Sequence, residues 1–292
     1  MTPFLLCAGS LELELSPSIG GAIRNFWKVG GDGVRRPLMR KSHSDEQNVL
    51  GLASFPLVPF VNRIRGGEFT FRGETVRVSP NMAGDPSPLH GQGWLGPWEL
   101  VGHGNQDAEL HFVHPAGEWP WDYEALQLFA LDPDGLTTRL SCLNTSDRPM
   151  PCGLGFHPYF PCTPQTRLDT RVDHVWEIDE HVLPTVKVPA TGRFDLHDRK
   201  VCGQGLDHGF GGWGGKATIS GDGVTITMTS SDADFFQLYS PATGGIFVAE
   251  PVTHANAAMN EPEERWSGLG LKLLEPGGEM TLTMRLEIAD SA

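Results

Sequence analysis

The chain has 292 residues and a formal net charge of −14. This acidity argues against nucleic acid and anionic membrane surfaces as partners, because both attract basic patches. The 36 Gly and 23 Pro residues make up about a fifth of the chain, above the average of about 12%, and this composition favours short strands joined by turns over long helices.

The cysteines and the N-terminal segment bear on the cellular compartment. The cysteine count is odd and no pair has the C-x-x-C spacing, so the sequence predicts reduced thiols and neither a disulfide framework nor a zinc knuckle. The cysteines are Cys7, Cys142, Cys152, Cys162 and Cys202. The N-terminal segment lacks a basic start and reaches acidic residues too early for a signal peptide, and no apolar run is long enough to span a membrane. We therefore expect a cytoplasmic protein.

Strand patterns recur along the whole sequence. At residues 11–15, Leu and Glu alternate strictly, which is the two-residue period of a strand with one face in water. Further strand-like runs lie at residues 68–71, 76–78, 109–113, 125–131, 137–143, 224–229, 235–239 and 280–288. Turn residues separate these runs, as in Asp132-Pro133-Asp134-Gly135, where Asp and Gly tolerate the positive φ of a hairpin.

Two segments depart from the strand pattern. Residues 256–266 carry an acidic run and could hold one or two helical turns. The Gly-rich residues 209–215 are expected to form an irregular loop, because they neither follow a strand nor open a helix as a phosphate loop must. No fixed repeat, linker or composition break divides the chain. The most economical fold is therefore all-β, with one domain over residues 1–292 built of packed antiparallel sheets.

Two histidines and a glutamate, each in a frame of Gly, Pro or aromatic residues, are the strongest chemical signal. His157 lies between a Phe and a Pro, where aromatic surface could shield the imidazole and tune its protonation. His90 is followed by glycines that allow close backbone approach and by Trp94, a flat face on which a sugar ring could stack. Glu250 follows an apolar strand, where a carboxylate is costly unless it is paired or used. Each residue alone also fits a structural role, as a core histidine, a loop histidine or a charged strand end.

Three further polar residues could bind hydroxyl groups. Arg63 could donate through its guanidinium fork. Asp207 could accept a hydrogen bond from a hydroxyl or cap a turn, and Gln237 could point into a cleft or stabilise a strand edge. A hydrolytic nucleophile is not evident, since the sequence has no G-x-S-x-G elbow and no cysteine in an activating frame. Metal catalysis lacks a complete ligand motif, since H-E-x-x-H is absent.

Six short motifs follow one another in the chain. They are Asn62-Arg63-Ile64, Leu89-His90-Gly91, Gly155-Phe156-His157-Pro158-Tyr159-Phe160, Leu206-Asp207-His208, Gln237-Leu238-Tyr239 and Ala249-Glu250-Pro251. In this order they resemble the motifs of the aldose 1-epimerases, the galactose mutarotase family. The resemblance runs from about residue 55 to the turn at residues 274–279. Any one motif is weak, but six in sequence are strong.

The resemblance implies a large antiparallel β-sandwich of the galactose mutarotase-like type, with a cleft over one sheet and with neither a metal nor an organic cofactor. In that family the glutamate that matches Glu250 is the general base, which removes the proton of the anomeric hydroxyl. The histidine that matches His157 is the acid that protonates the ring oxygen. One base and one acid suffice for this chemistry, because opening the ring and closing it on the other face of the carbonyl needs only proton transfers.

The other candidate residues match positions that bind the sugar. Arg63, His90, Asp207 and Gln237 match residues that bind hydroxyl groups, and His90 also supports the ring-oxygen side. The implied function is the interconversion of the α and β anomers of a free aldose such as galactose or glucose. The expected partner is therefore a small-molecule sugar, and the oligomeric state is left open.

Two other functions remain compatible with the sequence. A hexose-6-phosphate 1-epimerase would use the same acid and base with cationic residues for the phosphate, and the N-terminal segments offer Arg24, Arg35, Arg36 and Arg40. The Asn62-Arg63-Ile64 motif instead resembles the branch that acts on unphosphorylated sugars. A non-catalytic sugar-binding module would keep the cleft, since fold alone does not fix function, but a mere binder has no need of both an acid and a base.

Overall fold

The computed structural model describes residues 3–221 and 223–290, and nearly all of their regular structure is β. Among these residues, no helix has the length and apolar character needed to cross a membrane. All five cysteines are free thiols, and Cys142, Cys152 and Cys162 are buried. The all-β expectation is therefore confirmed.

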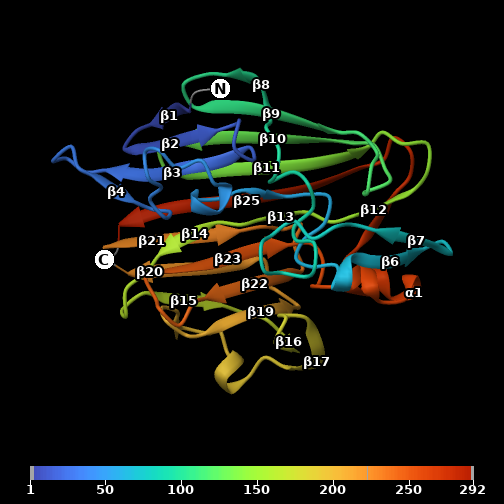
Figure 1. The fold of residues 1–292 in the computed structure, drawn as a ribbon. Helices are drawn as coiled ribbons and strands as arrows, with labels where there is room; N and C mark the ends of the chain where they lie inside the picture. Colours follow the sequence, from blue (N-terminus) through green and yellow to red (C-terminus); the bar gives the residue numbers. More distant parts are fainter. Residues whose placement is uncertain (1–2, 222, 291–292) are drawn as a thin grey trace.

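Three sheets hold most of the strands (Figure 1). A four-stranded sheet has the order β1 (Phe4–Ala8), β2 (Leu11–Ser16), β3 (Ala22–Val29) and β4 (Arg35–Pro37). A nine-stranded sheet has the order β18 (Arg199–Lys200), β15 (Arg167–Thr170), β20 (Lys216–Gly221), β21 (Val224–Thr229), β25 (Glu279–Asp290), β11 (Gly135–Asn144), β10 (Tyr123–Asp132), β9 (Asp107–His114) and β8 (Glu99–His103). An eight-stranded sheet has the order β17 (Pro184–Pro189), β16 (His174–Ile178), β19 (Leu206–Gly211), β22 (Phe235–Ser240), β23 (Ile246–Val252), β13 (Gly155–Phe156) and β5 (Pro56–Leu57), with β14 (Tyr159–Pro161) also paired to β23.

The remaining elements are short. Two small ribbons are formed by β12 (Met150–Cys152) with β24 (Lys272–Leu274) and by β6 (Glu68–Phe71) with β7 (Glu74–Arg77). The helical turns are η1 (Val49–Gly51), η2 (Arg65–Gly67), η3 (Gly192–Phe194), η4 (Ala258–Asn260), α1 (Glu263–Trp266) and η5 (Ser267–Leu269). The helical turns expected at residues 256–266 are thus present as η4 and α1.

One continuous hydrophobic core joins the nine-stranded and eight-stranded sheets. It contains Leu140 and Met284 from the former and Phe236 and Phe247 from the latter, all fully buried. Side chains alternate along each strand, so every second residue reaches this core. Burying apolar surface at about 25 cal/mol per Å² is the main stabilising contribution to such a sheet pair.

Two sequence expectations need correction. The Gly-rich segment is not wholly irregular, because its first three residues, Gly209 to Gly211, form the end of β19 and pair with β22. Glu250 does not follow a strand either: β23 continues to Val252, so the carboxylate is held within the strand. The predicted strands at residues 68–71 and 224–229 are observed with the same ends, and most of the others extend by one or two residues.

Candidate active site

The strand that carries Glu250 is buried on both faces. Along β23, Phe247 and Ala249 pack into the main core, whereas Val248 and Val252 belong to a second, smaller hydrophobic cluster. Glu250 lies between the last two and points to their side of the sheet, because successive side chains alternate. The strand therefore delivers one carboxylate, 2% exposed, to an otherwise apolar face.

Strand pairing brings Gln237 and Asp207 to the same face. Gln237 on β22 is the direct cross-strand partner of Glu250, and Asp207 on β19 lies opposite Tyr239 of β22. Gly209 lies opposite Gln237, where a Cβ atom would be 3.1 Å from the Oε1 atom of that glutamine. Glycine at this position leaves room for the amide, so three neighbouring strands present polar groups side by side.

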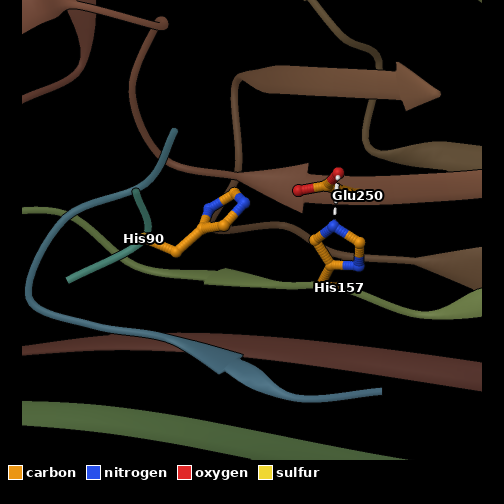
Figure 2. A group of neighbouring side chains, drawn as sticks. All are labelled: His90, His157 and Glu250. Atoms are coloured by element: carbon orange, nitrogen blue, oxygen red, sulfur yellow. Dashed lines mark ion pairs between the residues drawn. The ribbon is translucent and has the colours of Figure 1, made fainter. Parts of the chain in front are cut away.

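The backbone register places His157 opposite Glu250. Gly155, two residues before His157, pairs with Val252, two residues after Glu250. Tyr159, two residues after His157, pairs with Val248, two residues before Glu250. The same antiparallel register thus holds on both sides of the histidine. Figure 2 shows the outcome: the imidazole points toward the carboxylate, with Nε2 of His157 3.5 Å from Oε1 of Glu250.

His90 comes from a loop whose backbone is held in an unusual conformation. Its φ is 60° and that of Gly91 is 71°. The backbone N–H of Asn62 donates to Nδ1 of His90 at 3.1 Å, and the N–H of His90 donates to the carbonyl of Asn62. A Cβ atom on Gly91 would lie 2.1 Å from the carbonyl oxygen of Val58, so only glycine allows this close approach.

Arg63 is oriented by a residue that the sequence did not single out. Its Nε donates to Oδ2 of Asp85 at 2.8 Å, in an ion pair that is about nine-tenths buried on both sides. Its backbone N–H is held by the side chain of Asn256. Because Asp85 takes the Nε–H, the two Nη groups at the end of the guanidinium are the donors left for a ligand.

All six predicted site residues line one pocket of about 300 Å³. They are Arg63, His90, His157, Asp207, Gln237 and Glu250. The rest of the lining includes Phe55, Asn62, Leu89, Tyr159 and Tyr239. A larger hollow of about 740 Å³ lies between β17 and the helical turns near α1, and none of the six contributes to it. The residues that the sequence grouped by motif are therefore grouped in space.

Burial shifts the proton affinities of the facing pair in opposite directions. It raises the pKa of the Glu250 carboxyl well above its usual range, and the neighbouring Asp207 raises it further. Burial lowers the pKa of His157 to about 3, and the Arg40 cation adds to that effect. Both shifts favour the uncharged form of each group. The Glu250 carboxylate is therefore a stronger base, and the His157 imidazolium a stronger acid, than the same side chain free in water.

The polar groups around this pair are incompletely satisfied. Nε2 of Gln237 donates to Oδ1 of Asp207 at 2.7 Å, and burial raises the pKa of that aspartate. Oε1 of Gln237 and Oε2 of Glu250 are buried and have no hydrogen-bond partner in the described part of the chain. Unpaired buried polar atoms cost free energy. A ligand with hydroxyl groups would satisfy both oxygens.

The three central side chains are close enough for a metal ion to be considered. One ligand atom each from His90, His157 and Glu250 lies within 4.8 Å of the others. However, Nδ1 of His90 already accepts the N–H of Asn62, so the neutral ring carries its proton on Nε2. A protonated nitrogen cannot bind a metal. The arrangement instead suits donation of a hydrogen bond by Nε2 of His90.

Two aromatic residues in the site were not assigned a role from sequence. The ring of His157 stacks on Phe55, with 4.5 Å between the ring centres, and contacts Tyr159 in a tilted arrangement at 4.7 Å. Tyr159 belongs to the same short motif as His157, which could have marked it. Phe55 and Asp85 lie outside the motifs and carry no local signal.

The four arginines considered for a phosphate group are absent from the pocket lining. Arg24 donates to three backbone carbonyls of residues 43–46. Arg35 pairs with Glu12 and Arg36 pairs with Asp32 at the protein surface. The guanidinium of Arg40 lies behind Tyr159, where it donates to the carbonyls of Leu50 and Leu52.

Comparison with known proteins identifies the family and the fold of this chain. The sequence model of the family described as aldose 1-epimerase matches residues 11–287. The uncharacterised protein YphB of Escherichia coli K12 is 34% identical over 99% of both chains. A solved structure from Escherichia coli K12 superposes with a TM-score of 0.88 at 31% identity over 99% of both chains. A galactose mutarotase-like protein of Clostridium acetobutylicum superposes with a TM-score of 0.84 at 20% identity, covering 98% of this chain and 95% of that one, which shows the same fold. The expected β-sandwich type is thereby confirmed, and this chain belongs to the aldose 1-epimerase family.

Proposed function

We propose that this protein is an aldose 1-epimerase that interconverts the α and β anomers of a free aldose, with Glu250 as the base and His157 as the acid. The observation that carries the proposal is the contact of Nε2 of His157 with Oε1 of Glu250, 3.5 Å apart in a pocket lined by hydrogen-bonding groups. A volume of about 300 Å³ is at the lower end of the range for small-molecule sites and suits a monosaccharide.

The reaction needs two proton transfers and no other group. In the reactive form of the pair, the single proton lies on His157 and Glu250 is ionised. The Glu250 carboxylate takes the proton of the anomeric hydroxyl while the His157 imidazolium gives its proton to the ring oxygen, and the C1–O5 bond breaks to leave the open-chain aldehyde. Rotation about C1–C2 presents the other face of the carbonyl, and the reverse transfers close the ring. Both side chains are uncharged after ring opening, which is the state that their burial favours. The site thus lowers the free energy of the ring-opened complex.

The surrounding residues supply orientation. The Nη groups of Arg63, the carboxyl of Asp207 and the free Oε1 of Gln237 can bind sugar hydroxyls, and Nε2 of His90 can donate toward the ring oxygen. Holding the sugar in a reactive geometry removes part of the entropic cost of the reaction.

Polarimetry tests the proposal directly. The optical rotation of freshly dissolved α-galactose and of α-glucose should decay faster with catalytic amounts of protein, in proportion to its concentration. Glucose 6-phosphate, followed in the same way, shows whether a phosphorylated sugar is preferred. Binding of a sugar without any acceleration of the decay would instead identify a sugar-binding module and refute the proposal.

A further inference from the structure

Behind the pocket, five side chains form one bent stack that includes the proposed acid. The guanidinium carbon of Arg40 lies 3.5 Å from the ring centre of Tyr159, and the ring centres of Tyr159 and His157 are 4.7 Å apart. His157 also stacks on Phe55, and Phe55 stacks on Trp94 with 5.6 Å between ring centres. The ring centres of Phe55 and Tyr159 are themselves 6.3 Å apart, so the imidazole contacts two neighbouring aromatic rings, one of which is backed by a cation.

Arg40 is anchored so that its charge stays in this position. Its backbone N–H donates to the carbonyl of Tyr159 at 2.8 Å. Its Nη2 group donates to the carbonyl of Leu50 at 2.6 Å and to that of Leu52. These contacts fix the plane of the guanidinium against the phenol ring, where a cation is attracted to the π electrons.

Arg40 also differs from the other cation at the site. Arg63 is neutralised by Asp85, whereas Arg40 forms no ion pair with a carboxylate in the described part of the chain. Burial lowers the pKa of Arg40, and the neighbouring Tyr159 and Glu46 offset part of that effect. A half-buried cation with no carboxylate at ion-pair distance is costly to maintain, and this one lies beside the proposed acid.

We propose that Arg40 is a positioning residue of this site: it fixes Tyr159 against His157 and holds a permanent positive charge behind the facing pair of His157 and Glu250. The inference rests on the proposed function, because it assigns Arg40 a task in the same proton transfers. The two separations place the guanidinium carbon within about 8 Å of the imidazole centre. At that distance a unit charge shifts a titration by about 1.5 pH units at an effective dielectric constant of about 20.

The direction of the effect follows from the groups that face His157. They are Glu250 from β23, His90 from its loop, Tyr159 from β14 and Arg40 from the segment after β4. Catalysis needs one proton on the pair of His157 and Glu250, so activity falls when a second proton binds at low pH and when the single proton leaves at high pH. A nearby cation disfavours both protonations. Removing it should move both limbs of the pH profile upward.

The test compares Arg40→Gln, Arg40→Lys and Arg24→Gln. Arg24 is the matched control, because it is also a buried arginine that donates to backbone carbonyls, but it lies outside the stack. We expect Arg40→Gln to move both limbs of the kcat/KM profile upward by about 1.5 pH units. Arg40→Lys should keep the limbs near their wild-type positions, and Arg24→Gln should not move them. If Arg40→Gln does not fold, Arg40→Met, which preserves the packing of the stem, replaces it.

A second readout does not depend on activity. NMR titration of labelled histidine, with the His157 signal identified by its loss in His157→Asn, should show the midpoint of His157 moving up from about 3 in Arg40→Gln and returning toward it in Arg40→Lys. Unchanged midpoints and limbs in Arg40→Gln, or equal shifts in the Lys and Gln variants, would overturn the proposal. If the wild-type protein fails to accelerate mutarotation, the proposed function fails, while the NMR titration still decides the role of Arg40.

Discussion

Replacing Glu250 by Gln should separate activity from stability. The substitution keeps the size of the side chain but removes the ability to accept a proton. A positioned acid or base typically contributes about 10²- to 10⁴-fold in rate, which corresponds to about 3–5 kcal/mol of transition-state stabilisation. We therefore expect kcat for mutarotation to fall by about 10²- to 10⁴-fold.

The same variant should not lose stability. Oε2 of Glu250 has no hydrogen-bond partner among the described residues, and burial raises the pKa of the carboxyl well above its usual range. Between the unfolded and the folded pKa, the folded state binds more protons than the unfolded state, so stability falls as pH rises. Each unit of the shift costs about 1.4 kcal/mol at pH values above the folded pKa. The amide of the substituted glutamine cannot ionise, so the variant should be as stable as the wild type or more stable at pH 8.

Polarimetry at saturating sugar and urea denaturation at pH 5 and pH 8 measure the two effects. Glu124→Gln is the matched control, because Glu124 lies on β10 of the other large sheet, where it contacts His111 at the surface. That control should keep wild-type activity. A mutarotation rate within about threefold of wild type in Glu250→Gln would refute the assignment of the base, since it lies below the smallest expected effect. A marked loss of stability of Glu250→Gln at pH 8 would refute the argument that the buried, ionisable carboxyl of Glu250 costs stability.

Three further outcomes are expected. Asp85→Asn should raise KM about tenfold with a smaller change in kcat, because Arg63 loses the charged hydrogen bond that orients it; a fall in kcat alone would contradict this. NMR should show the wild-type His157 neutral down to about pH 3. Because the pKa of His157 is lower in the folded than in the unfolded state, its contribution to stability grows as pH rises from 3 toward 6.5. A titration midpoint near 6.5 would show that the ring is not desolvated. Gly91→Ala should destabilise the protein at least about 2 kcal/mol more than Gly66→Ala does. Both glycines have positive φ, but of the two only Gly91 would place a Cβ atom against a carbonyl oxygen. Equal losses of stability in urea denaturation would contradict the clash.

The sequence predicted the polar residues that line the site better than it predicted the residues that hold them in place. The six polar residues were visible because each lies in a short motif, and the order of these motifs along the chain indicated a family. Asp85 and Phe55 were not visible, because neither has a local pattern, and their roles come from contacts with Arg63 and His157 that are distant in sequence. For the same reason, the sequence offered Arg40 only as one of four arginines available for a phosphate group under an alternative function.

By itself the sequence determined that the chain is built of strands, because apolar alternation and turn residues are local properties. It also determined which residue types were available for acid–base chemistry. Only the tertiary structure decided that His157 faces Glu250, since that depends on the register of two strands about ninety residues apart in the chain. It also decided their proton affinities, because desolvation depends on everything packed around a group and not on its neighbours in sequence.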